Sequence, residues 1–115
     1  MRPIVIIESP FAGKTEEERE RNLRYLRAAI RDSLLRGEAP FASHALYTQP
    51  GILSDDVPAE RQEGILAGFA FRRAAQITAV YYDLGVSTGM TQGMNHATAM
   101  KCPIEYRSLP GWGQP

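Results

Sequence analysis

Hydrophobic positions along the chain fall into short continuous runs and longer helical repeats. Residues 3–7 and 77–82 are runs rich in β-branched and aromatic side chains, a pattern typical of strands that are buried on both faces. Residues 102–109 predict a final strand, because apolar and polar side chains alternate there. A weaker pattern at residues 42–47, after Pro40, predicts a short strand or extended segment.

Three helices are expected between these strands. Thr15 precedes three glutamates, and Glu18 stands where a capping box places an acidic residue, so a helix is predicted over residues 15–37. A proline suits the first position of a second helix, predicted over residues 58–75. A serine–threonine pair caps a third helix, predicted over residues 87–100.

This order of elements predicts the fold class. Strands that alternate with helices imply right-handed crossovers and a mostly parallel sheet. We therefore expect residues 1–115 to form one α/β domain with a small three-layer, Rossmann-like architecture. Its mostly parallel sheet would have about four strands, with helices on both faces. Such sheets bind their ligands at the carboxyl ends of the strands.

Composition narrows the range of partners. The 13 basic and 13 acidic residues cancel, so no overall charge draws the chain to a nucleic acid polymer or an anionic membrane. No apolar stretch approaches the about 18–20 residues that a membrane span needs. The first apolar run is too short for a signal peptide, and the single cysteine fits a reducing compartment, so a cytoplasmic location is expected. Two separated histidines and one cysteine give no metal signature, and no cofactor is expected.

Two carboxylates are the candidate catalytic residues. Glu8 and Asp83 each follow a strongly hydrophobic strand at its carboxyl end. If the two strands are neighbours, the carboxylates flank one crevice and suit general acid–base work, glycosyl chemistry or the binding of ribose hydroxyls. The alternative is that both carboxylates cap loops by accepting hydrogen bonds from backbone amides.

Candidate ligand contacts lie mainly in loops that follow the strands. Residues 85–89 open a helix, so their amides and hydroxyls suit an anion, although an ordinary helix cap has the same composition. A histidine in the 42–47 segment suits acid–base work, and a buried structural histidine is an equal alternative. The candidate ligand-binding residues are Ser9, Pro10, Phe11, Ser43, His44, Tyr47, Gly85, Ser87, Thr88, Gly89 and Met90.

Three further features have structural interpretations. The FAGKT run at residues 11–15 is similar to a phosphate-binding loop, but Glu8 replaces the first glycine of that motif and would repel phosphate. His96 has no partner nearby in the sequence, so we expect it to be structural. Cys102 enters a strand and is expected to be buried.

Several of these segments resemble the nucleoside 2-deoxyribosyltransferase-like superfamily. The similar features are an opening strand that ends in ESPFAG, the run VYYDLGVSTGM, and a helix with NHATAMKCP that leads into the last strand. Over nearly its whole length the chain is more closely similar to small, often phage-encoded proteins that are grouped with that superfamily. That closer similarity is carried by ESPFAG, RGEAPFASHALYTQPG and D-x-G-x-S-x-GM.

The resemblance implies a single nucleoside 2-deoxyribosyltransferase-like domain that binds a nucleoside or nucleotide. The characterised enzymes of the superfamily cleave or exchange N-glycosidic bonds, using a glutamate nucleophile early in the helix after the glycine loop. Here Gly93 stands at that position, and no glutamate occurs between Asp83 and Pro103. The sequence alone therefore does not decide whether the chain is an enzyme.

Three interpretations stay open. The chain is a glycosidic-bond hydrolase or transferase that uses Glu8 or Asp83 instead, a non-catalytic sensor or sponge for a nucleotide-derived signal, or an interaction protein with a vestigial pocket. The resemblance also implies a homo-oligomer, a dimer or larger, for which Gly64, Gly68 and Phe71 are candidate contacts. For a phage-encoded protein, the expected location is the host cytoplasm.

Overall fold

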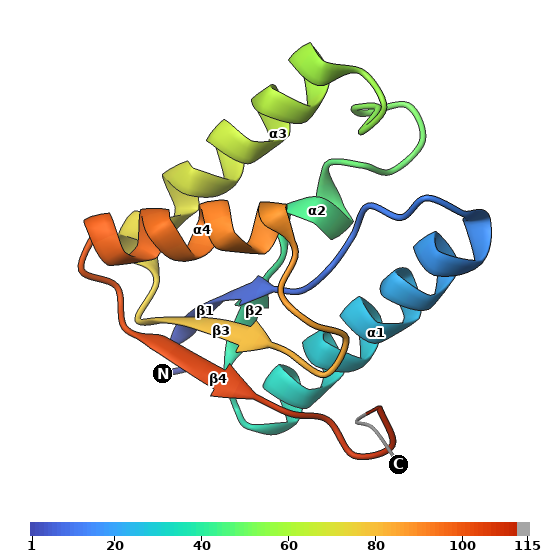
Figure 1. Ribbon diagram of the computed structural model, residues 1–115. Coiled ribbons are helices and arrows are strands. Elements are labelled where there is room, and N and C mark those ends of the chain that lie inside the picture. The colour runs from blue at the N-terminus through green and yellow to red at the C-terminus, as the bar shows by residue number, and fades with distance from the viewer. Residues whose placement is uncertain (113–115) are drawn as a thin grey trace.

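The computed structural model describes residues 1–112, in which four parallel strands form one sheet (Figure 1). The strands are β1 (Ile4–Glu8), β2 (Ala39–Phe41), β3 (Ile77–Tyr81) and β4 (Ile104–Arg107), in the spatial order β2-β1-β3-β4. The helices are α1 (Glu16–Leu35), α2 (Ser43–Leu46), α3 (Pro58–Phe71) and α4 (Thr88–Ala99), with a 3₁₀ turn, η1 (Arg72–Ala74). The predicted α/β class with a mostly parallel sheet is confirmed.

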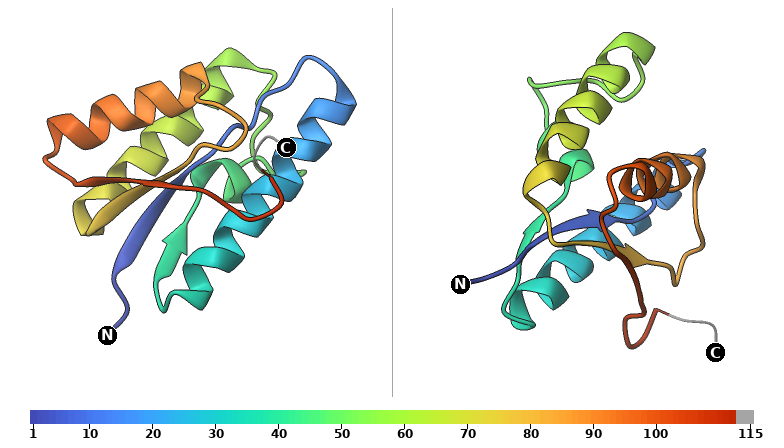
Figure 2. Two further views of the ribbon diagram at one scale, coloured as in Figure 1. Left: turned by 60° about the horizontal axis from the view of Figure 1, so that its bottom comes forward. Right: turned by 90° about the vertical axis from the view of Figure 1, so that its left-hand side faces the viewer.

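Helices cover both faces of the sheet. Figure 2 shows α1 on one face and α3 and α4 on the other. The crossover from β1 to β2 runs through α1, and the crossover from β2 to β3 runs through α3, so the chain changes faces at β1. In doubly wound sheets this topological switch point is where a crevice opens at the carboxyl ends of the strands. Here the switch point lies between β1 and β3. Within residues 1–112, no helix is long and apolar enough to cross a membrane.

Alternate residues of the central strands build the core against α1. Val5 and Ile7 of β1 and Ala79 and Tyr81 of β3 are all buried and belong to one hydrophobic cluster with Tyr25 of α1. Successive residues of a strand point to opposite faces, so these odd-numbered positions share the α1 face. The even-numbered positions are left for the face that holds α3 and α4.

The helix starts follow the predicted signals. The hydroxyl of Thr15 accepts a hydrogen bond from the Glu18 amide at 3.1 Å, while the Glu18 carboxylate reaches back to the Lys14 amide at 2.8 Å. Pro58 is the first residue of α3. Gly37 follows α1 with φ +85°, the left-handed conformation that a glycine adopts without strain.

A buried polar network closes the carboxyl end of α1. Arg107 of β4 donates two hydrogen bonds of 2.7 Å to the carboxylate of Glu38, which also accepts one from Ser33. The Tyr81 hydroxyl donates to Asp32 at 2.7 Å and accepts from Arg107. Asp32 and Ser33, near the end of α1, therefore face the sheet, where they hydrogen-bond to Tyr81 and Glu38.

The segment after α1 differs from the prediction. The strand is Ala39–Phe41 rather than residues 42–47, and Ser43–Leu46 form the short helix α2. An edge strand tolerates Pro40, which has no amide proton to donate to a neighbouring strand. The absence of a side chain at Gly68 lets Ser43 of α2 approach α3, because a Cβ there would lie 2.7 Å from the Ser43 hydroxyl. Gly68, a candidate contact between subunits, thus packs closely within the chain.

Two boundaries near the carboxyl end also differ. The last strand covers Ile104–Arg107 rather than residues 102–109, and α3 ends at Phe71 and continues as η1. Trp112, in the tail that follows β4, packs edge-on against Tyr25, with ring centroids 5.1 Å apart. Residues 113–115 of that tail lie outside the described residues.

We predict that Arg107→Ala lowers the free energy of unfolding by about 3–5 kcal/mol, because it leaves the buried Glu38 carboxylate unpaired. Hydrogen bonds from Arg107 and Ser33 hold the pKa of Glu38 below its ordinary value, so the stability due to this group is lost as pH falls through that lowered pKa. Urea denaturation between pH 3 and pH 7 measures both effects. Arg24→Ala removes an exposed arginine of α1 and serves as the matched control. Equal losses in the two variants would contradict the prediction.

Candidate functional site

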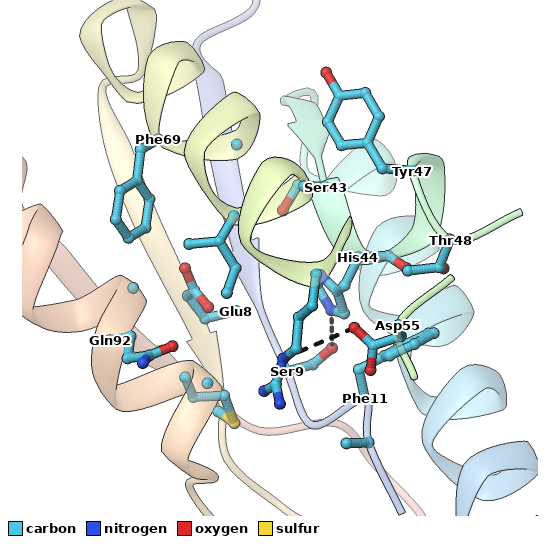
Figure 3. Close-up of a pocket in the computed structure, with 18 of the residues that line it drawn as sticks. Glu8, Ser9, Phe11, Ser43, His44, Tyr47, Thr48, Asp55, Phe69 and Gln92 are labelled. Atoms are coloured by element: carbon cyan, nitrogen blue, oxygen red, sulfur yellow. Dashed lines mark hydrogen bonds and ion pairs between the residues drawn. The ribbon is translucent and has the colours of Figure 1, made fainter. Parts of the chain in front are cut away.

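A cleft of about 370 Å³ opens at the carboxyl ends of β1 and β2, between α2, α3 and the start of α4 (Figure 3). Its size is within the range of small-molecule sites. Three of the candidate residues, Asp83, Pro10 and Gly85, do not line it. The candidate residues that do line it are Glu8, Ser9, Phe11, Ser43, His44, Tyr47, Ser87, Thr88, Gly89 and Met90.

Glu8 supplies a carboxylate to the floor of the cleft. Its Oε2 atom accepts a hydrogen bond from Arg72 at 3.0 Å, whereas Oε1 has no hydrogen-bond partner among residues 1–112. The Glu8 side chain is 15% exposed. Burial raises the pKa of Glu8 to about 7, although the nearby Arg72 guanidinium acts in the opposite direction. One oxygen is therefore anchored, and the other is free to meet a ligand.

Arg72 joins three elements at this point. Besides Glu8 of β1, its guanidinium donates to the Thr78 hydroxyl of β3 at 3.1 Å and to Nδ1 of His96 in α4 at 2.8 Å. Because Nδ1 accepts this bond, the proton of the neutral His96 ring is on Nε2. Burial and the Arg72 charge lower the pKa of His96, and the Phe69 ring stacks on it at a centroid distance of 3.9 Å. His96 is thus a structural support of the site.

Gly93 makes room for the Glu8 carboxylate. A Cβ atom built on Gly93 would overlap the carboxylate carbon and both carboxylate oxygens of Glu8. Gly93 is buried in the second turn of α4 and faces the cleft. The Glu8 carboxylate therefore lies in the space that a side chain at Gly93 would otherwise fill.

A serine–histidine pair forms the neighbouring wall. Ser9 directly follows Glu8, and its hydroxyl lies 3.0 Å from Nε2 of His44, which belongs to α2 (Figure 3). The Phe11 ring meets the imidazole edge-on at a centroid distance of 5.8 Å. Burial lowers the pKa of His44 to about 4, so the ring is neutral at neutral pH.

The mouth of the cleft carries opposite charges. Arg61 of α3 pairs with Asp55 at 3.8 Å, a long separation for an ion pair, and both side chains are partly exposed. The guanidinium also lies beside the first turn of α4, 3.7 Å from the position of a Cβ on Gly89. A second, more open hollow of about 600 Å³ continues from this rim towards Arg19.

The expectation that Glu8 and Asp83 flank one crevice is wrong. The strands are neighbours, but Glu8 pairs with Val80, so Asp83 lies three positions further on and leaves the sheet on the α1 face. The Asp83 carboxylate accepts hydrogen bonds from the hydroxyls of Tyr25 and Ser108 and from the Leu109 amide. It caps the segment that follows β4, which is the alternative role considered for it.

The glycine loop provides a turn and a helix cap. Gly85 adopts φ +90°, and the Ser87 hydroxyl accepts from the Met90 amide at 3.2 Å at the start of α4. Residues 87–90 line the cleft, whereas Gly85 lies outside it. Only the second half of this loop is thus in a position to contact a ligand.

Comparison with known proteins assigns the chain to a family without assigning an activity. Residues 3–107 match the model of a domain of unknown function, DUF7768. The chain belongs to this family. No curated protein matches it.

In this DUF7768 domain, sequence reasoning missed Arg72 and the significance of Gly93. Arg72 is 64 residues from Glu8, and nothing local distinguishes it from Arg73 beside it. The one available signal was the pattern of small residues on α4, since a buried glycine inside a helix indicates close approach of another group. Ser9 and His44 were identified singly, but their pairing depends on α2, which the sequence pattern did not predict.

We predict that Gly93→Ala destabilises the domain by about 1–3 kcal/mol, because the added methyl group and the Glu8 carboxylate compete for one space. Gly89→Ala is the control in the same helix. Its Cβ would have ordinary contacts, and alanine favours a helix by up to about 1 kcal/mol, so its stability should be unchanged or higher. Chemical denaturation of both variants, and of Gly93→Ala combined with Glu8→Ala, measures the effect. The double variant should recover part of the loss; no recovery would contradict the steric explanation.

We predict that the contribution of Glu8 to the free energy of unfolding decreases as pH rises from about 4.5 to about 7, because the pKa of this group is raised in the folded state. His44 and His96 act in the opposite direction, since their pKa values are lowered in the folded state. The test is therefore the difference between the wild-type and Glu8→Gln profiles: the stability of the wild type relative to Glu8→Gln should fall over this range. The titration of the Glu8 side-chain carboxyl carbon by NMR gives the pKa directly, and a midpoint near 4.5 would be incompatible with this account.

Proposed function

We propose that the chain binds a nucleoside or nucleotide in the cleft and cleaves or transfers its N-glycosidic bond, with Glu8 as the reacting carboxylate. The observation that carries the proposal is the buried carboxylate of Glu8, which has one oxygen held by Arg72 and the other free in the cleft. It lies at the topological switch point, where sheets of this kind bind their ligands.

The missing glutamate of the helix supports this choice of residue. In the enzymes that the chain resembles, the nucleophile comes from the helix after the glycine loop, at the position of Gly93. The Glu8 carboxylate lies against Gly93, in the space of its absent side chain. A carboxylate from β1 therefore reaches the place where a helix glutamate would start.

The reaction follows from the free oxygen. Oε1 of ionised Glu8 attacks the anomeric carbon of the sugar, and the bond to the base nitrogen breaks with its electron pair leaving on the base. Water or a second base then attacks the same carbon, and the sugar–Glu8 bond breaks with its pair returning to the carboxylate. Arg72 keeps Oε2 in place throughout, so that Oε1 stays aimed into the cleft.

The rest of the cleft suits the other parts of such a ligand. Phe11 and Phe69 present aromatic surface to a base or sugar. Arg61 at the mouth, beside the amides at the start of α4, suits a phosphate group. These features favour a nucleotide over an unrelated apolar ligand.

A second candidate is binding without chemistry, as a sensor or sponge for a nucleotide-derived signal. The raised pKa of Glu8, about 7, favours it, because a protonated carboxyl group donates a hydrogen bond to a ligand and does not attack it. For either function we propose a cytoplasmic protein, in the host cytoplasm if phage-encoded, that assembles as a homo-oligomer. Because Gly64 also packs within the chain, against Leu53 and Tyr47, the partly exposed Phe71, stacked on Phe41, is the remaining candidate contact between subunits.

The test is to screen nucleosides, mononucleotides and signalling nucleotides for thermal shift, and then to analyse each mixture for free base by chromatography. We expect base release by the wild-type chain and a loss of about 10⁴-fold in Glu8→Gln. Glu63→Gln, on the exposed side of α3, should keep full activity. Base release that survives in Glu8→Gln would reject Glu8 as the reacting group.

The two candidate functions give different results in this screen. Tight binding of an intact ligand, with no free base, supports the sensor or sponge and rejects the enzyme. The absence of a shift with every ligand of these classes counts against both functions.

A further inference from the structure

Ser9 and His44 form a second hydrogen-bonded pair in the cleft, and neither residue takes part in the contacts between Glu8 and Arg72. Ser9 and Glu8 are consecutive, so their Cα atoms are about 3.8 Å apart, and both residues line the cleft. The Ser9 hydroxyl has His44 Nε2 as its hydrogen-bond partner at 3.0 Å. Ser9 directly follows β1 and His44 belongs to α2, whereas Arg72 of η1 contacts groups on β1, β3 and α4.

We propose that Ser9 and His44 form the proton-transfer pair that accepts the proton of the attacking water in the second half of the reaction. The proposal rests on the function proposed above and deepens it, because it names water as an acceptor that the site activates. In this scheme the Ser9 hydroxyl contacts the water, and His44 acts through Ser9.

The carboxylates near the cleft are already engaged. Glu8 is bonded to the sugar at this stage and leaves as a carboxylate, so it does not accept the proton itself. Asp55 is paired with Arg61 at the mouth, and Glu60 accepts from the Ser54 amide. Asp83 faces α1 and lies outside the cleft.

His44 is in the form that can accept a proton, and Ser9 is its contact in the cleft. No carboxylate among residues 1–112 pairs with the ring to stabilise an imidazolium, so the proton that it takes up passes on readily to solvent; the Phe11 ring holds the imidazole edge-on. Burial lowers the pKa of His44 to about 4, so the imidazole is neutral at neutral pH and has one unprotonated nitrogen. Gly68 fixes the position of α2, because the Ser43 side chain packs directly on it.

The step balances in protons and electrons. The water oxygen forms a bond to the anomeric carbon, and the bond from that carbon to Glu8 Oε1 breaks with its electron pair going to the carboxylate. The water proton passes to the Ser9 oxygen while the Ser9 proton passes to His44 Nε2. The imidazolium then releases its proton to solvent, which returns the pair to its starting state.

The experiment follows free base after rapid mixing of enzyme and a nucleoside or nucleotide that the wild-type chain cleaves. In Ser9→Ala and His44→Gln we expect a burst of about one base per enzyme, followed by steady turnover reduced by about 10²–10⁴-fold. Sodium azide should restore turnover in both variants and give a glycosyl azide, because an anion attacks without losing a proton. A residue with only a structural role would give neither the burst nor the rescue. Glu63→Gln is the control variant, on the exposed side of α3.

Each outcome decides the proposal. Full turnover in both variants, or reduced turnover that azide does not restore, overturns the role of the pair while leaving Glu8 as the reacting group. A wild-type chain that releases no base from any nucleoside or nucleotide overturns the proposed enzyme and this step together. Ser9→Ala removes a single oxygen atom, so it carries the same expectations alone if His44→Gln does not fold.

Discussion

The hydrogen-bonded ion pair between Glu8 and Arg72 determines how the cleft is built. Both side chains are largely withdrawn from water, with 15% of Glu8 and 1% of Arg72 exposed. Removing two charges from water is costly, and a buried pair of this kind rarely exceeds apolar packing in stability. Arg72 meets that cost by donating three hydrogen bonds to groups on β1, β3 and α4. The pair therefore stabilises the fold inefficiently, and it lies where doubly wound sheets bind ligands. Both observations favour a functional explanation for the pair.

The packing of the Glu8 carboxylate against Gly93 is related to the same ion pair. A carboxylate that comes from a strand end needs space above the sheet, and a glycine in the facing helix provides it. It also needs a cation to hold one oxygen, and η1, the 3₁₀ turn that follows α3, provides it through Arg72. A glycine in α4 and a glutamate at the end of β1 are therefore two parts of one arrangement. For this reason the absence of glutamate from α4 is compatible with the glycosidic chemistry proposed above.

Local patterns in the sequence predicted the elements well and the contacts between them poorly. The strand at residues 3–7 and the cap at Thr15 depend on neighbouring residues, so they were predictable. The side on which Asp83 lies depends on the register of β1 against β3, which no local pattern encodes. Ten of the thirteen candidate residues line the cleft, because most of them were taken from the segments that follow the strands of an α/β sheet. Arg72, whose guanidinium organises the cleft, lies in η1, 64 residues from Glu8 in the sequence, and only the folded chain shows that the two meet.

The two consecutive residues at the end of β1 give the cleft two environments. Glu8 faces the charged groups around Arg72, whereas Ser9 faces a neutral imidazole that is shielded by Phe11. A charged His44 beside Glu8 would favour the ionised carboxylate, but burial keeps the ring neutral by lowering its pKa. Arg72 is then the one cation in contact with Glu8 among residues 1–112, and it does not outweigh burial. The ionisation of this single carboxyl group therefore sets the charge of the cleft floor near neutral pH.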